Sequence, residues 1–193
     1  MVKPLLLEEN TATLAQYLQS GRMDFLLDNC ELDPSIFDRY VYQKEHLLLA
    51  VPESLPVNES LRAYQVPTSS IKNRIPAVSL QAFTNETFIF MKQENDTGKR
   101  AARICQEHHF HPRVLFELDQ QMTSYNVTCS GMGISFIGDL LISLVPPNPN
   151  VVYYRLEEKD SLRNIYFYWK KGRYISHTMS AFLDLLSSFD NLI

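Results

Sequence analysis

Short apolar runs alternate with amphipathic stretches along the chain. Near its start, the apolar run at residues 5–7 predicts a short buried strand, and Asn10 or Thr11 is then placed to cap a helix. Gly21 predicts the end of that helix, and residues 23–27 predict the next strand. A strand, a helix and a strand in this order predict neighbouring parallel strands.

The rest of the chain repeats this alternation after one long predicted strand. Residues 40–51 are rich in Tyr, Val and Leu and end at Pro52, which predicts a long strand that crosses from one half of the protein to the other. Further strands are predicted at residues 87–91, 113–118, 133–136, 151–154 and 164–169, and helices around residues 101–105 and at 120–130, 137–144 and 176–187. Such regular alternation predicts an α/β fold.

Composition and charge narrow the class of protein. The 193 residues are 45% hydrophobic and 21% charged, as in ordinary globular chains. The formal net charge of -4 argues against a broad phosphate-binding surface, so no direct contact with nucleic acid is expected. The absence of a C-x-x-C pair and of a secretory apolar region favours a cytoplasmic protein. No apolar run approaches the roughly 18 residues of a membrane-spanning helix, so no membrane contact is expected.

The stretch CSGMGISFIGD at residues 129–139 concentrates three of the six glycines of the chain. Its Gly-x-Gly-x-x-x-x-Gly spacing departs from the dinucleotide-binding fingerprint, and no acidic residue follows about 20 positions later. The simpler interpretation is that Gly131 ends a helix and Gly133 lets the chain enter the next strand against its neighbours. No cofactor is predicted.

Other candidate chemistry is weak. The cluster His108, His109 and His111 lies at a predicted helix end, where solvated histidines are more common than a metal site, so no metal is predicted. No Gly-x-Ser-x-Gly, Ser-x-x-Lys or Cys-His signature is present, so no catalytic residue and no enzyme are predicted. The aromatic residues at 166–169 favour core packing over a stacking platform.

Polar residues gather at the predicted strand ends and helix starts. In open α/β sheets, ligands bind beyond the carboxyl ends of the strands, where helix N-termini offer unpaired N–H groups to anions. A cleft for a small anion is therefore the functional hypothesis, and simple helix capping is its alternative. The candidate site residues are Asn10, Thr11, Asn29, Lys92, Gln93, Gln121, Met122, Thr123 and Ser135.

Three segments resemble one protein family. The run LLLEENTATLAQYLQSGRMDFLLDN resembles the strand, E-x-G-T, helix, L-x-x-G-x-L-D and strand segment of LysR-type transcriptional regulators. The run SGMGISFIGD resembles their A-G-x-G-I-x-x-x-P segment, although Gly138 stands where the family commonly has Pro, and SHTMSAFLDLL resembles their last helix. The resemblance extends in order from Leu5 to Leu186.

This resemblance implies the effector-binding domain, with a two-lobed, periplasmic-binding-protein type 2 fold. Lobe I is expected at residues 1–50 and 156–193 and lobe II at 51–155, with hinges near Ala50 and Arg155. The N-terminal DNA-binding region, and the first strand and helix of lobe I, are then absent from the chain.

The resemblance also implies a role for the candidate residues. Thr11 matches the Thr of E-x-G-T that faces the cleft between the lobes, with Asn10 in place of the Gly, and residues 121–123 match a segment that lines the cleft from lobe II. The expected protein is a cytoplasmic homodimer that senses a small, anionic effector. The alternatives are a stand-alone solute-binding or enzymatic member of the same fold, and a dimerising scaffold that no longer binds an effector.

Overall fold

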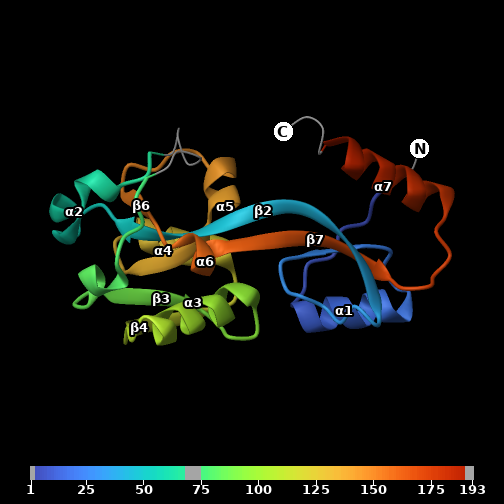
Figure 1. The fold of residues 1–193 in the computed structure, drawn as a ribbon, viewed down its shortest axis with the longest axis horizontal. Helices are drawn as coiled ribbons and strands as arrows, with labels where there is room; N and C mark the ends of the chain where they lie inside the picture. The colour runs from blue at the N-terminus through green and yellow to red at the C-terminus, as the bar shows by residue number, and fades with distance from the viewer. Residues whose placement is uncertain (1–2, 68–74, 190–193) are drawn as a thin grey trace. The chain divides into compact units, whose positions relative to one another are not determined.

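The computed structural model describes residues 3–67 and 75–189. Its helices are α1 (Thr11–Ser20), α2 (Val57–Ser60), η1 (Arg62–Tyr64), η3 (Leu80–Phe83), α3 (Asp96–Glu107), α4 (Gln121–Cys129), α5 (Asp139–Leu144), α6 (Glu158–Ser161) and α7 (His177–Phe189). Its strands are β1 (Leu26–Asp28), β2 (Phe37–Pro52), β3 (Thr87–Met91), β4 (Arg113–Leu118), β5 (Ile134–Gly138), β6 (Val151–Arg155) and β7 (Leu162–Lys170). The predicted α/β alternation is confirmed (Figure 1).

The chain divides into two compact units. Unit 1 comprises residues 1–44 and 164–193, and unit 2 comprises residues 45–163. The long strands β2 and β7 contribute residues to both units, and they leave unit 2 at Glu45 and Arg163. The lobe boundaries expected near Ala50 and Arg155 stay a prediction.

Unit 1 is built around α1 and the strands β1 and β7. Asn10 caps α1, since its side-chain Oδ1 accepts the Thr13 N–H at 2.9 Å, and the helix ends before Gly21 as predicted. The buried side chains form one small core: Leu14, Leu18, Leu26, Phe37, Tyr166 and Tyr168. The predicted packing role of the aromatic run in β7 is therefore confirmed for these two tyrosines.

Three expectations for unit 1 are wrong. Residues 5–7 form no strand, and Leu5 and Leu6 are 86% and 89% exposed. A strand forms only when a neighbouring backbone pairs with it, and no strand within the described residues pairs with this segment. The second strand is Leu26–Asp28 rather than 23–27. It runs antiparallel to β7, and within the described residues no strand before α1 pairs with it.

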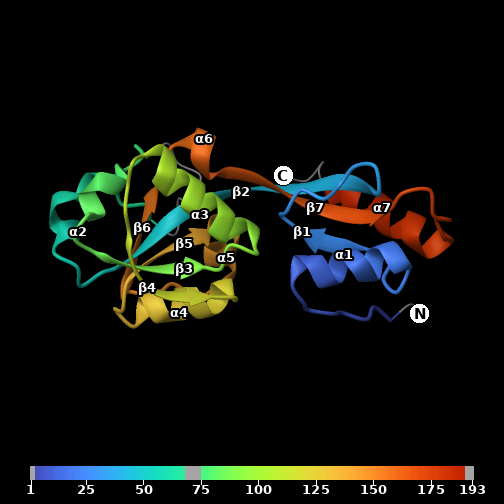
Figure 2. The same ribbon diagram turned by 90° about the horizontal axis from the view of Figure 1, so that it is seen from below.

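Unit 2 is a sheet covered on both faces. Strands β5, β3 and β4 are parallel, while β2 pairs antiparallel with β5 and β6. Successive β2 residues point to opposite faces, so Leu47 and Leu49 pack with Ile104 of α3, and Leu48 and Ala50 pack with α4 and α5 residues. Figure 2 shows α3 and α4 on opposite faces of these strands.

The glycine stretch serves the backbone, as its sequence predicted. Gly131 follows the last turn of α4 with φ of 87°, a left-handed conformation that favours glycine. At Gly133 the chain enters β5 so close to β3 that an added Cβ would lie 2.9 Å from the Thr87 carbonyl oxygen. Both interpretations are confirmed, and neither glycine points to a bound dinucleotide.

No helix within residues 3–67 and 75–189 is long and apolar enough to span a membrane.

Candidate functional site

The parallel strands of unit 2 place most of the predicted site residues at one edge of its sheet. Strands β3, β4 and β5 end at Met91, Leu118 and Gly138, and α3, α4 and α5 begin just beyond them. Parallel strands carry their carboxyl ends to the same edge. We call this region the polar edge; it comprises residues 92–97, 119–123 and 138–139 together with His46.

Lys92 lies at the polar edge between the ends of β3 and β4. Its backbone N–H donates to the Leu118 carbonyl at 2.9 Å, and its Nζ donates to Asp119 Oδ2 at 2.8 Å. This hydrogen bond raises the pKa of Lys92. The neighbouring Gln93 is exposed on the same loop. The ion pair is open to water, where such pairs add little to stability.

The start of α4 is the second part of the polar edge. Gln121 Nε2 donates to Thr97 Oγ1 at 3.4 Å, and Met122 and Thr123 are exposed. Gln120 occupies the N-cap position without a capping side-chain hydrogen bond, and the first turn holds no acidic residue. The first N–H groups of an α-helix have no partner within the helix, so this end of α4 presents a positive backbone field.

Ser135 is the one predicted residue of unit 2 that lies inside the protein. It is fully buried, and its Oγ shares a hydrogen bond of 2.8 Å with Thr128 Oγ1. This contact joins β5 to the inner face of α4.

A buried charge cluster, which the sequence did not predict, lies next to the polar edge. Arg163 Nε and Nη2 both lie on Glu45 Oε2, at 2.6 and 2.5 Å, and Nη1 donates to Asp96 Oδ2 at 2.9 Å and to Thr97 Oγ1 at 2.8 Å. The Arg163 and Glu45 side chains are 1% and 5% exposed. Arg100 Nε also donates to Asp96 Oδ2 at 3.0 Å.

Burial raises the pKa of Glu45 in this cluster. Desolvation raises the pKa of the Glu45 carboxyl above its ordinary value, the Arg163 guanidinium opposes that rise, and the charges of Asp139 and Asp96 reinforce it. The carboxylate also explains Gly138, because a Cβ there would collide with Glu45 Oε1. The departure from the proline of the family motif therefore leaves room for a charged side chain.

His46 and Asp139 contact each other at the polar edge, next to the end of β5. The His46 backbone N–H donates to Asp139 Oδ1 at 3.1 Å, and its ring Nδ1 lies 3.5 Å from Asp139 Oδ2. Throughout residues 3–67 and 75–189, no group of three or more His, Cys, Asp or Glu side chains is arranged to hold a metal ion.

The three predicted residues of unit 1 lie around the start of α1 and the end of β1. Thr11 Oγ1 donates to Asp28 Oδ2 at 2.8 Å, and Asp28 Oδ1 accepts the Cys30 N–H at 2.8 Å. Asn29 is half-buried beside Asp28 in the chain, and Asn10 caps the helix. Helix start and strand end thus meet here as at the polar edge, and Asp28 is the partner that sequence reasoning missed.

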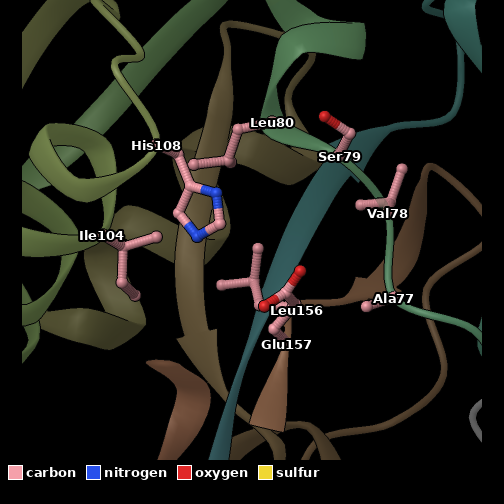
Figure 3. Close-up of a pocket in the computed structure, with 8 residues that line it drawn as sticks. All are labelled: Ala77, Val78, Ser79, Leu80, Ile104, His108, Leu156 and Glu157. Atoms are coloured by element: carbon pink, nitrogen blue, oxygen red, sulfur yellow. The ribbon is translucent and has the colours of Figure 1, made fainter. Parts of the chain in front are cut away.

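A small pocket lies at the other end of α3. It has a volume of about 180 Å³ and an apolar floor of Val78, Leu80, Ile104 and Leu156, with His108 and Glu157 at its rim (Figure 3). Ile104 of the pocket follows Thr97 of the polar edge by seven positions on α3, or roughly 10 Å of helix at about 1.5 Å per residue. None of the predicted site residues lines it.

Comparison with known proteins gives relatives for the whole chain. It is 22% identical over 188 residues to the uncharacterized HTH-type transcriptional regulator YcgK of Bacillus subtilis (strain 168), covering 95% of this chain and 57% of that protein. The chain thus spans little more than half of this relative's length.

Solved structures show the same fold. The regulatory domain of Synechocystis PCC6803 CcmR in complex with 2-PG matches with a TM-score of 0.75 and 17% identity, over 93% of this chain and 79% of that one. The effector-binding domain of BenM with its effector benzoate matches with a TM-score of 0.71 and 18% identity, over 95% and 76% of the two chains. The fold is thus the two-unit, type 2 periplasmic-binding-protein fold expected from the sequence.

The family follows from a match to a family model over nearly the full length. The LysR substrate binding domain model matches residues 2–190. This range contains every element described above and all nine predicted site residues. The chain therefore belongs to the LysR substrate-binding domain family.

Proposed function

We propose that this chain is the sensor part of a transcriptional regulator and binds a small anionic metabolite as its effector. The observation that carries the proposal is the polar edge of unit 2, where Lys92, Thr97 and Gln121 lie beside the uncapped start of α4. These groups offer a cation, hydrogen-bond donors and free backbone N–H groups, which together suit an anion. In unit 1, Thr11 and Asn29 supply further polar contacts to the effector.

An anionic effector agrees with the contacts of Lys92. Its present partner, Asp119, is exposed and adjoins the start of α4, so a ligand carboxylate can replace the Asp119 carboxylate without burying an unpaired charge. The benzoate named for BenM and the 2-PG named for CcmR are effectors or ligands of those proteins. For this chain we propose the class of ligand and no single compound.

We propose that the two units are the two lobes of the sensor and that β2 and β7 form the hinge between them. DNA contact is assigned to a helix-turn-helix region, as in the relative's name, and not to these residues. The net charge of -4 supports this division. We infer a regulator rather than an enzyme because the family is one of transcriptional regulators.

The effector site is tested by thermal shift with named probes. Benzoate and succinate are the anionic probes and choline is the cationic control, each added to wild type, Gln121→Ala and Thr11→Val. A stabilising anion is expected to lose about tenfold in affinity, or ~1.4 kcal/mol, in either variant. Gln106→Ala removes an exposed glutamine from α3 away from the edge and is expected to respond like wild type. Equal shifts in wild type and both site variants would refute the site.

We also propose that the chain forms a homodimer through the free edge of β4. This strand pairs only with β3 within the described residues, and Val114, Leu115 and Phe116 are 41%, 47% and 39% exposed. An apolar strand with an unpaired edge is a ready surface for a second strand.

Leu115→Lys is expected to convert the dimer to a monomer, because a charge on the free edge opposes pairing with a second copy. Size-exclusion chromatography with light scattering gives the mass. Leu144→Lys places the same charge at an 85% exposed leucine outside β4 and is expected to leave the dimer intact. A wild-type monomer, or a dimer that tolerates Leu115→Lys, contradicts this interface.

A further inference from the structure

The charge cluster joins the two strands that leave unit 2. Glu45 is the first residue of unit 2 on β2, and Arg163 is its last residue on β7. Their ion pair therefore fixes β2 and β7 to each other at the point where both strands pass out of the unit. Because Arg163 also donates to Asp96, the start of α3 is held to the same point.

A buried ion pair is a poor device for stability, because desolvating both charges offsets most of their attraction. A buried ion pair is better suited to holding the backbone in one of several possible arrangements. Arg163 suits this use, since its planar guanidinium carries donors in a fixed fork and all three of its nitrogens are engaged here. A strand that shifts relative to α3 must break contacts to Glu45, Asp96 or Thr97.

Thr97 connects this cluster to the polar edge. Its buried Oγ1 accepts one hydrogen bond from Arg163 Nη1 at 2.8 Å and one from Gln121 Nε2 at 3.4 Å. A hydroxyl oxygen has two lone pairs, so Thr97 Oγ1 accepts from Arg163 and Gln121 at the same time and links the two side chains. When the Gln121 amide donates to another partner, Thr97 Oγ1 keeps the hydrogen bond from Arg163 and loses the one from Gln121.

We propose that Arg163 and Thr97 are positioning residues that relay the state of Gln121 to β2 and β7. This inference rests on the proposed function, in which Gln121 contacts the effector. The bound effector accepts the hydrogen bond of the Gln121 amide, so Thr97 Oγ1 accepts from Arg163 alone. The contacts of Arg163 with Glu45 and Asp96 then change where β2 and β7 leave unit 2. Neither residue needs to touch the effector.

Hydrogen exchange on the full chain tests the relay without any ligand. Thr97→Val removes the shared oxygen at nearly constant volume, and Thr97→Ser keeps it. Amide exchange at residues 43–47 and 162–165 is expected to rise about tenfold in Thr97→Val and to stay near wild type in Thr97→Ser, as local opening does when a buried contact is lost. Amides of Phe88 and Phe90 in the β3 core report global unfolding and are expected to keep wild-type exchange.

A second set of hydrogen-exchange measurements uses Gln121→Ala. In the wild-type background it is expected to alter exchange at residues 43–47 and 162–165, and in the Thr97→Val background it is expected to add nothing further. Gln106→Ala serves as the matched control and should change neither segment. Wild-type exchange in Thr97→Val, or a Gln121→Ala effect that persists without the Thr97 hydroxyl, overturns the relay. Effector binding is measured separately by thermal shift, so a failure of the proposed function is distinguished from a failure of the relay.

Discussion

Arg163→Met is expected to destabilise the chain by about 3–5 kcal/mol at neutral pH, because it leaves buried carboxylates without their cation. Glu45 loses its contact with Arg163, and among the described residues Asp96 keeps the cation of Arg100 alone. Urea unfolding followed by circular dichroism measures the change. Arg103→Met breaks an exposed ion pair with Glu107 and is expected to cost about 0.5 kcal/mol or less. A loss below 1 kcal/mol for Arg163→Met would mean that the cluster is not buried as described.

The penalty of Arg163→Met is expected to depend on pH. The pKa of Glu45 is raised in the folded state, so its protonation favours folding below the unfolded pKa, and this contribution is lost as pH rises through the folded pKa. Removing Arg163 takes away the cation that opposes the rise, which raises this pKa further. Unfolding at pH 5 and pH 8 should therefore give a larger destabilisation at pH 8. The reverse order contradicts this assignment of Glu45.

Gly138→Ala is expected to destabilise unit 2 by about 3 kcal/mol, since the new methyl group collides with the Glu45 carboxylate and displaces it from Arg163. The same urea experiment measures this loss. In Glu45→Ala the colliding atoms are gone, so adding Gly138→Ala there should cost less, with a coupling of about 1–3 kcal/mol between the two positions. Strictly additive losses would show that the two side chains do not compete for one space.

Local patterns in the sequence predicted unit 2 well. The bounds predicted for β3 and β4 are those observed, because each is a short apolar run between polar loops within one parallel sheet. The cap at Asn10 was equally readable, since capping depends on residues three positions apart. The strand predicted at residues 5–7 was wrong, because an apolar run indicates that a segment tends to be buried but does not show which segment it packs against.

The sequence predicted the polar residues of the candidate site but not the buried charge cluster beside them. Lys92 and Gln121 lie at the strand end and the helix start that the sequence indicated, and their contact with an effector stays a prediction. Arg163 and Glu45 were missed because 118 positions separate them, and only the folded sheet brings them together. β2 also carries Asp38, Arg39 and Lys44, so Glu45 did not stand out in the sequence as the buried charge of this strand.

The buried position of Ser135 shows a limit of motif transfer. A residue in a recognised motif still alternates between faces of its strand, and here the face is turned to Thr128 of α4. The aromatic run in β7 shows the opposite case, since the same alternation placed Tyr166 and Tyr168 in the core as expected.

An NMR titration of the ¹⁵N-labelled chain with the anion that stabilises it in the thermal-shift screen tests the central claim most directly. The polar edge as the effector site predicts that the largest shift changes fall on residues 92–97 and 121–123, with smaller ones at Thr11. Shift changes confined to the pocket around Leu80 and His108, with the polar edge unmoved, would contradict it.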